Sequence, residues 1–205
     1  MNEILTYFPS IKSAFFSYLI SILILSISIL SLFYKKIRFS LLLHPYEVYK
    51  GKRLHTLLTS MLPHQSLLHA LINTLFILFF SYDAQQIMTY KYGESYAIFL
   101  TLYLLTILIL IPNILLTLIE RSNFTFTCIG SSGLTFGLIG FSLAYFPFEK
   151  VNSIFPFIQY SYQFWIYFLI IKFIFAFFLR KKFNNTLHLI AFFWGTLLAL
   201  VQTQL

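Results

Sequence analysis

Charged residues are scarce in this chain of 205 residues. Aspartate, glutamate, lysine and arginine together make up 10% of it, whereas hydrophobic residues make up 59% and aromatic residues 20%. The mean hydropathy of +0.83 lies well above that of a soluble domain, so the composition indicates a membrane protein. The chain has one cysteine, Cys128, which excludes an intrachain disulfide. There is no internal repeat or low-complexity tail, so we interpret residues 1–205 as a single membrane domain.

Long apolar runs take up most of the sequence. A helix needs about 20 residues to cross about 30 Å of hydrocarbon, and backbone polar groups in lipid must be satisfied within the segment, which favours helices over strands. The first run is too long for the core of a signal peptide, and we expect it to be a retained helix. The sequence therefore predicts an all-α, polytopic bundle of six transmembrane helices. The spans lie at about 13–34, 66–82, 95–118, 127–147, 162–179 and 186–203.

The net charge of +8 comes from basic residues in short loops beside the spans. Attraction to the anionic headgroups of the lipid bilayer explains such a distribution, so we expect no nucleic-acid partner. The acidic residues are interpreted as lying at a terminus, in loops or at span ends. The basic loops gather mostly on the side where the second, fourth and sixth spans begin, and the positive-inside rule would place that side in the cytoplasm.

A few strongly polar residues fall inside the predicted spans. Burying such a residue in a membrane without a partner is costly, so each is a candidate functional residue, although a structural hydrogen bond is the simpler explanation for any one of them. Lys172 in the fifth span could reach a lipid headgroup or face the bundle. The polar residues are His69, Asn73, Ser131, Ser132, Lys172 and His188.

The order of the spans predicts which of these residues meet. Spans 2, 4 and 6 run in the same direction, so His69, Ser132 and His188 should lie at similar depth near one side of the membrane. Small residues allow transmembrane backbones to approach closely, and we expect spans 4 and 6 to bring the serine and the histidine within hydrogen-bonding distance. The small residues that follow them at helical spacing are Gly133, Gly137, Gly140, Ala191 and Gly195.

A serine and a histidine so placed are the parts of a nucleophilic site. The histidine would act as the general base for the serine hydroxyl, and because no carboxylate lies within reach of His188 along its own helix, the pair would work as a dyad. His69 and Asn73, four residues apart on one helical face, would donate to the oxyanion together with the backbone N–H of Ser132. Gly130 and Gly133 would allow a substrate backbone to approach the serine.

These residues also resemble the motifs of a known family. The run Gly-Ser-Ser-Gly at 130–133, with Gly137 and Gly140 behind it, resembles the GxSG helix of rhomboid intramembrane proteases. The pattern His64-x4-His69-x3-Asn73 resembles the signature of their second helix. His188 with Ala191 and Gly195 resembles their sixth-helix HxxGxxxG pattern. The resemblance covers residues 13–203.

The resemblance implies a serine endopeptidase that cleaves transmembrane protein substrates near the membrane surface, without a metal or organic cofactor. It implies catalytic Ser132 and His188, an oxyanion hole of His69 and Asn73, and an aromatic ring, Phe136, against the histidine. It also implies a partly embedded first loop, at about 35–63. Bacterial six-helix rhomboids lie in the inner membrane and open to the outside, which conflicts with the charge pattern above.

The sequence departs from the family at scaffold positions. The family's Trp-Arg pair in the first loop appears as His55-Thr56, and its first small residue after the histidine is Ala191 instead of glycine. The glutamate expected just after the second helix appears as Gln85 or Gln86.

Three other functions are compatible with parts of this pattern. An inactive rhomboid-like protein could bind membrane clients without cutting them. A metal site built on His64 and His69 would lack a third ligand, and a transporter would need paired charges or symmetric broken helices. The sequence does not indicate an oligomeric state.

Overall fold

The computed structural model describes residues 8–151, 157–178 and 185–204 and confirms the predicted all-α fold. These residues contain two isolated bridges, Leu43 with Cys128 and Lys150 with Tyr160, and otherwise no β-structure. Four of the helices, α1, α5, α6 and α9, are long and apolar enough to cross a membrane, and α7 and α8 are shorter apolar helices. The helices are α1 Phe15–Phe33, α2 Lys35–Leu41, α3 Pro45–Tyr49, α4 Thr56–Thr59, α5 Leu67–Tyr92, α6 Glu94–Ile119, α7 Ser132–Tyr145, α8 Ser161–Phe178 and α9 Asn185–Gln204.

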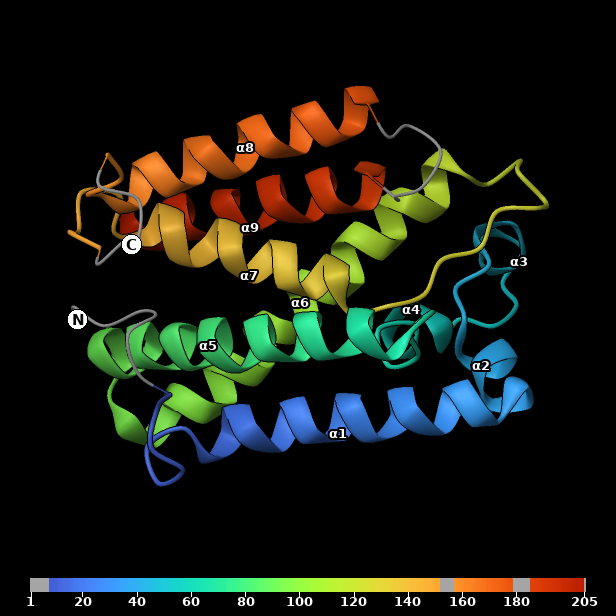
Figure 1. Ribbon diagram of the computed structural model, residues 1–205, viewed down its shortest axis with the longest axis horizontal. Coiled ribbons are helices and arrows are strands. Elements are labelled where there is room, and N and C mark those ends of the chain that lie inside the picture. Colours follow the sequence, from blue (N-terminus) through green and yellow to red (C-terminus); the bar gives the residue numbers. More distant parts are fainter. Residues whose placement is uncertain (1–7, 152–156, 179–184, 205) are drawn as a thin grey trace.

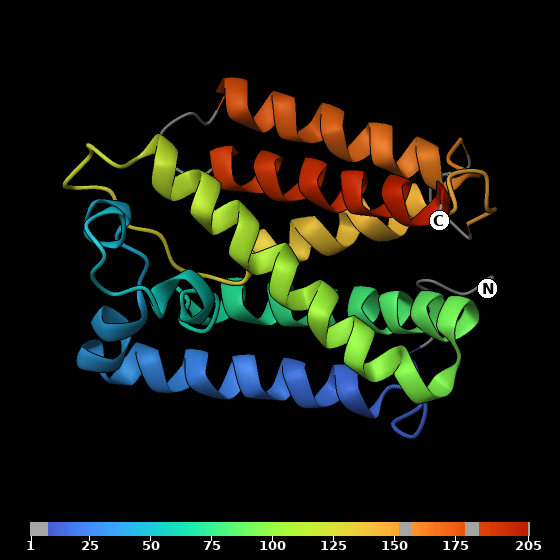
Figure 2. The same cartoon turned by 180° about the vertical axis from the view of Figure 1, so that it is seen from behind.

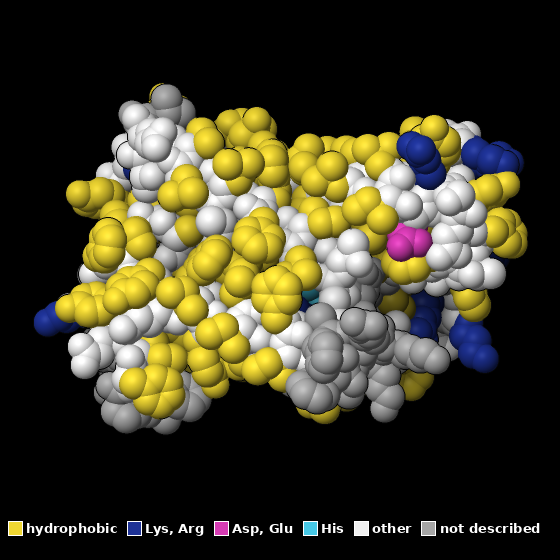
Figure 3. Space-filling view, turned by 90° about the horizontal axis from the view of Figure 1, so that it is seen from above, with side chains coloured by type: hydrophobic (Ala, Val, Ile, Leu, Met, Phe, Trp, Pro, Cys, Tyr) yellow, Lys and Arg dark blue, Asp and Glu magenta, His cyan; other side chains and the backbone are white. Residues whose placement is uncertain are grey.

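Apart from α6, the long helices follow the longest axis of the molecule (Figure 1). The short helices α2, α3 and α4 gather at one end of that axis, and the described part of the chain begins and ends toward the other. Seen from the α8 side, hydrophobic side chains cover the middle of the molecule, and the lysine and arginine side chains stand at its ends (Figure 3). A bilayer surrounding the middle would leave those charges at the headgroups, as expected for a multi-pass membrane protein.

The second span and the fourth differ from their predicted bounds. Helix α5 begins after Ser66, whose hydroxyl accepts a hydrogen bond from the His69 backbone N–H at 3.3 Å, and it continues to Tyr92 instead of ending at residue 82. The interpretation of Asp83 as a span-end residue is therefore wrong, because this residue lies within α5 and is buried. Helix α7 begins at Ser132 instead of residue 127. Residues before it run as an extended segment that bridges to the first loop.

Small side chains let α1 pack against α5. The buried positions of α1 recur at steps of three and four residues, which places them on one face of the helix. Serine at most of these positions keeps the face narrow, so the two helices can lie close together. These serines are Ser17, Ser21, Ser28 and Ser31.

Helix α6 crosses the other helices obliquely, as Figure 2 shows from behind. It carries Pro112 in its interior, and the next residue anchors the first loop. The Asn113 side-chain amide donates a hydrogen bond of 2.7 Å to the carbonyl of Leu57 in α4. The short helices of the loop between α1 and α5 are in this way fixed to the bundle beside the start of α7.

Candidate functional site

Ser132 and His188 come together where α7 and α9 begin. Ser132 is the first residue of α7, and His188 lies in the first turn of α9. The His188 Nε2 atom is 2.8 Å from the Ser132 Oγ atom, and both residues are buried, at 7% and 8% exposure. A base at hydrogen-bonding distance from a hydroxyl in a buried site is the arrangement that nucleophilic catalysis by serine requires.

Direct contact between the backbones of α7 and α9 explains this proximity. A Cβ atom added to Gly140 would lie 2.1 Å from the carbonyl oxygen of Phe192, and one added to Gly195 would lie 1.9 Å from the carbonyl oxygen of Gly137. Either position is open to glycine alone unless the helices separate. Ala191 is fully buried in the same seam. The small residues of the two helices therefore lie where the sequence predicts close packing.

The ring of Phe136 covers His188. Phe136 lies one turn after Ser132 on α7, and its ring stacks on the imidazole with centroids 4.4 Å apart and planes inclined by 18°. Stacking restricts rotation of the imidazole, so the Nε2 atom is held toward Ser132. The position is the one at which the family resemblance expects an aromatic side chain.

Gly130 brings the chain against two histidines before α7 begins. Its φ of +117° lies in the region that favours glycine, and an added Cβ would lie 3.3 Å from His69 Cε1 and 3.4 Å from His64 Cδ2. The backbone N–H of Gly130 donates a hydrogen bond of 2.9 Å to the Ser60 carbonyl in the first loop. This glycine therefore serves the approach of the chain to α5.

The two adjacent serines have different partners. The Ser131 backbone N–H donates to His64 Nε2 at 3.1 Å, and the Ser131 hydroxyl lies at the same distance from that atom. On the other side of the ring, His64 Nδ1 lies 2.8 Å from the hydroxyl of Ser28 in α1. Ser131 thus belongs to a buried network that fixes the start of α7, whereas Ser132 faces His188.

The protonation of His64 follows from its surroundings. Burial lowers the pKa of His64 to about 4, so the ring is neutral at pH 7. Because Nε2 accepts the Ser131 N–H, the single ring hydrogen is on Nδ1 and donates to Ser28. The Ser28 hydroxyl can then donate to the Leu62 carbonyl, 2.7 Å away. The network is fully satisfied when His64 carries no charge.

The two predicted oxyanion donors lie on α5 beside α7. The Asn73 side-chain amide donates to the carbonyl of His69 at 2.8 Å, and its oxygen accepts a hydrogen bond of 3.0 Å from the Thr135 hydroxyl. The amide retains a second N–H for another acceptor. His69 is half-buried, and its ring meets that of His64 edge-on at 5.1 Å. Both side chains therefore lie near the segment that carries Ser132.

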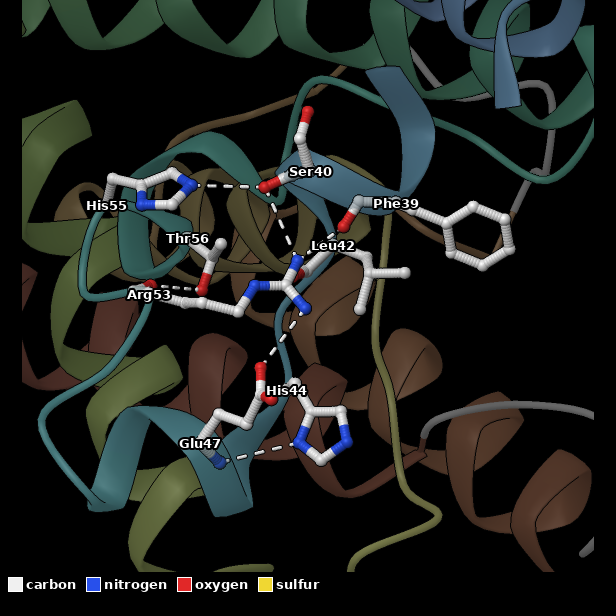
Figure 4. A network of polar contacts seen from close by, with 8 residues as sticks. All are labelled: Phe39, Ser40, Leu42, His44, Glu47, Arg53, His55 and Thr56. Atoms are coloured by element: carbon white, nitrogen blue, oxygen red, sulfur yellow. Dashed lines mark hydrogen bonds and ion pairs between the residues drawn. The ribbon is translucent and has the colours of Figure 1, made fainter. Parts of the chain in front are cut away.

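Arg53 anchors the first loop (Figure 4). The sequence alone did not indicate this role for Arg53. Its guanidinium donates to the carbonyls of Phe39, Ser40 and Leu42, the last at 3.0 Å, and forms an ion pair with Glu47 at 3.4 Å. The family comparison had pointed to residues 55 and 56 instead. A search for any arginine in the loop would have found it, since Arg38 and Arg53 are the only two between the first spans.

His55 and Thr56 make lesser contacts in the same loop. His55 Nε2 lies 3.1 Å from the carbonyl oxygen of Ser40, and the Thr56 hydroxyl donates to the carbonyl of Arg53 at 2.7 Å. These residues support the loop without the several carbonyl contacts that the nearby arginine makes.

Lys172 faces the bundle, which decides the alternative that the sequence left open. Its Nζ atom lies 2.9 Å from His188 Nδ1, the ring nitrogen on the side away from Ser132. It also lies 4.3 Å from the centroid of the Phe136 ring. Nothing in the sequence pattern gives this orientation, because the residue on α9 that receives the lysine is sixteen positions away.

The described residues contain no cluster of side chains suited to a metal ion around these histidines. No group of three histidine, cysteine, aspartate or glutamate side chains is close enough there to hold a metal ion. His64 and His69 are in contact, but the hydrogen bonds of His64 go to two serines.

Fold and site together define a class of protein: a helical, multi-pass membrane protein with a serine and a histidine buried between two closely packed helices. The family model of the rhomboid domain matches residues 51–204, most of the chain. The chain therefore belongs to the rhomboid family. The family comprises intramembrane serine proteases and inactive homologues of them. No curated protein matched the chain.

Proposed function

We propose that the chain is an intramembrane serine endopeptidase with Ser132 as nucleophile and His188 as general base. The observation that carries this proposal is the 2.8 Å contact between the two side chains in a buried site. Inactive relatives would have no need of a serine hydroxyl aligned with an imidazole nitrogen. The alignment, the stacked Phe136 ring and the family membership support one reading: a working dyad.

The reaction follows from the positions of these groups. The Ser132 oxygen attacks the carbonyl carbon of the scissile bond while its proton passes to His188 Nε2. Asn73, His69 and the Ser132 backbone N–H, which has no partner within its own helix, donate to the oxygen that becomes negative. The imidazolium then gives its proton to the leaving amine. Water repeats the sequence on the acyl-enzyme and releases the acid.

The substrates are proposed to be single-span membrane proteins. The site lies between the first turns of α7 and α9, so we expect a peptide to reach it from the bilayer or from the membrane surface. Similarity to the family favours small residues at the scissile bond and a substrate helix that unwinds readily. The proposed location is the inner membrane of a bacterium.

Purified protein in liposomes tests the proposal directly. A single-span model substrate with alanine and glycine at the cleavage region would be incubated with the wild type, Ser132→Ala and His188→Ala. We expect each variant to lose at least about a thousandfold in rate, the size of effect seen when a serine nucleophile or its base is removed. Ser131→Ala is the matched control, since the backbone N–H that binds His64 remains, and it should lose less than about tenfold.

Two outcomes would overturn the proposal. Cleavage by Ser132→Ala at the wild-type rate would assign the activity to another residue or another protein. Binding of the substrate by the wild type without any cleavage would identify an inactive homologue that holds membrane clients.

A further inference from the structure

Lys172 occupies the place where serine hydrolases usually hold a carboxylate. In the usual triad an acidic side chain accepts the Nδ1–H of the histidine and fixes its tautomer. Here the amine nitrogen of Lys172 lies 2.9 Å from His188 Nδ1. The amine also lies 3.5 Å from the side-chain oxygen of Asn185.

Apart from these partners, the described side chains that line the crevice around Lys172 are apolar. Toward α7 it faces the ring of Phe136, and toward α9 it faces His188 and Asn185. Among the described residues no acidic side chain forms an ion pair with it. Among the described residues, His69 of α5 is a further titratable group whose charge would act on His188. The lysine and the histidine share a small crevice with Phe136, Phe168, Leu169, Leu189 and Phe192.

The hydrogen bond between the two nitrogens can run in either direction. An uncharged amine has a lone pair and accepts the Nδ1–H, so His188 Nε2 is left with its lone pair toward the Ser132 hydroxyl. An ammonium has donors only and must donate to Nδ1, so Nε2 carries the ring hydrogen of the neutral imidazole. In that second tautomer the ring cannot take the proton of Ser132.

We propose that Lys172 is a positioning residue for His188 whose own protonation decides whether the dyad is competent. This inference rests on the proposed proteolytic function. With the amine neutral, the Ser132 oxygen forms a bond to the substrate carbonyl carbon, its proton goes to Nε2, and the resulting imidazolium is stabilised through its Nδ1–H to Lys172. The imidazolium later returns the Nε2 proton to the leaving amine. The lysine gains no bond and loses none in this cycle.

The rate of serine labelling by a fluorescent fluorophosphonate tests the inference, because the probe reacts with an activated serine and needs no substrate. The wild type, Lys172→Met and Lys172→Arg would be labelled in detergent micelles from about pH 6 to about pH 10, the range in which perturbed lysines and histidines titrate. Lys91→Met is the matched control, since that lysine contacts the Gln202 carbonyl far from the site. Ser132→Ala measures labelling elsewhere.

We expect the wild-type labelling rate to rise about tenfold or more with pH, and Lys91→Met to follow it. Lys172→Met should lack that rise and should react faster than the wild type at the acid end, because no ammonium opposes the productive tautomer. Lys172→Arg, a permanent cation, should stay slow at every pH. Coincident pH profiles for the wild type and Lys172→Met would overturn the inference.

An NMR spectrum of the wild-type protein tests the inference without relying on the folding of the Lys172 variants. With 15N-labelled histidine, the His188 signals, assigned by their loss in His188→Ala, should change from the Nε2–H to the Nδ1–H tautomer as the pH rises. One unchanged tautomer would overturn the inference. Labelling that depends on Ser132 but not on Lys172 would refute this inference alone, whereas labelling that does not depend on Ser132 would refute the proposed function as well.

Discussion

Helices α7 and α8 differ sharply in how they pack, although both contribute to the candidate site. Every residue of α7 except Phe136 is buried. Among the described side chains of α8, residues 161–174, only Ser161 is buried. Polar contacts between the described residues of α8 and α9 include the Trp165 side chain, which donates to the Thr196 hydroxyl at 2.9 Å, and the Lys172 contacts near His188.

The difference shows how a membrane protein can combine a fixed site with an accessible one. Ser132 and His188 are aligned by helices whose backbones touch, so their separation is set by the fold. The lysine behind the histidine comes from a helix whose described side chains are mostly only partly buried. A movement of α8 would leave the backbone contacts between α7 and α9 in place, but it would remove Lys172 from His188 Nδ1.

Gly195→Ala should break the fixed side of this comparison and have the largest effect on proteolysis among the substitutions compared below. The added Cβ would meet the backbone oxygen of Gly137 at 1.9 Å, so α7 and α9 must separate. Overpacking of this kind costs about 1–3 kcal/mol or more, and we expect a loss near the upper end, together with loss of most proteolysis. Unfolding in mixed micelles and cleavage of the model substrate are the measurements.

Gly133→Ala, on the facing helix α7, is the control for that substitution on α9. Its Cβ would meet only the Leu187 side chain, at 3.3 Å, which can adjust. The expected change in the free energy of unfolding is below about 1 kcal/mol. Equal destabilisation by the two substitutions would show that direct backbone contact does not hold α7 and α9 together.

Protonation of His64 at low pH should destabilise the buried start of α7. We expect this to be the next largest effect. The pKa of His64 is lowered by burial from 6.5 to about 4 in the folded protein, so the unfolded chain takes up this proton at a higher pH. The contribution of the neutral ring is complete above about pH 6.5 and is lost progressively as the pH falls toward 4. We expect the wild-type free energy of unfolding to decline over that interval.

His64→Gln isolates this dependence. Glutamine cannot take up a proton, so the variant should be less stable than the wild type at pH 7 but should show a shallower decline between about pH 6.5 and pH 4. Parallel pH dependences in the two proteins would mean that other groups cause the acid sensitivity. The hydrogen bonds of His64 would then stabilise the start of α7 without causing the loss of stability at low pH.

The sequence was sufficient for those features that depend on spacing within one helix and on the order of helices. The shared direction of spans 2, 4 and 6 placed Ser132 and His188 at one depth, and the small residues at Gly140 and Gly195 indicated close packing. Contacts between distant segments could not be predicted in the same way. Ser28 is one of several similar serines on α1, and only the folded loop shows that it pairs with His64.

Charged residues were the least predictable part. Arg53 binds carbonyls of a loop whose path depends on short helices with no periodic signal of their own. Asp83 was placed at a span end because the apolar run stops there, yet α5 continues with residues that favour helices and are covered by neighbours. The end of a hydrophobic run predicts where the segment that can face lipid ends. A helix that packs against other parts of the protein can continue beyond that point.

A substitution on the exposed face of α8 should have the smallest effect. Two isoleucines, one on α8 and one on α7, allow the comparison. Ile170 on α8 is 51% exposed, whereas Ile139 on α7 is 1% exposed. Ile139→Ala should cost about 2–5 kcal/mol, because it leaves a cavity among buried neighbours, and Ile170→Ala should change the free energy of unfolding by less than about 0.5 kcal/mol. The same micelle unfolding assay measures both. A cost at Ile170 as large as that at Ile139 would mean that a protein surface covers α8 in the membrane, and substrate could not then approach across this face without displacing it.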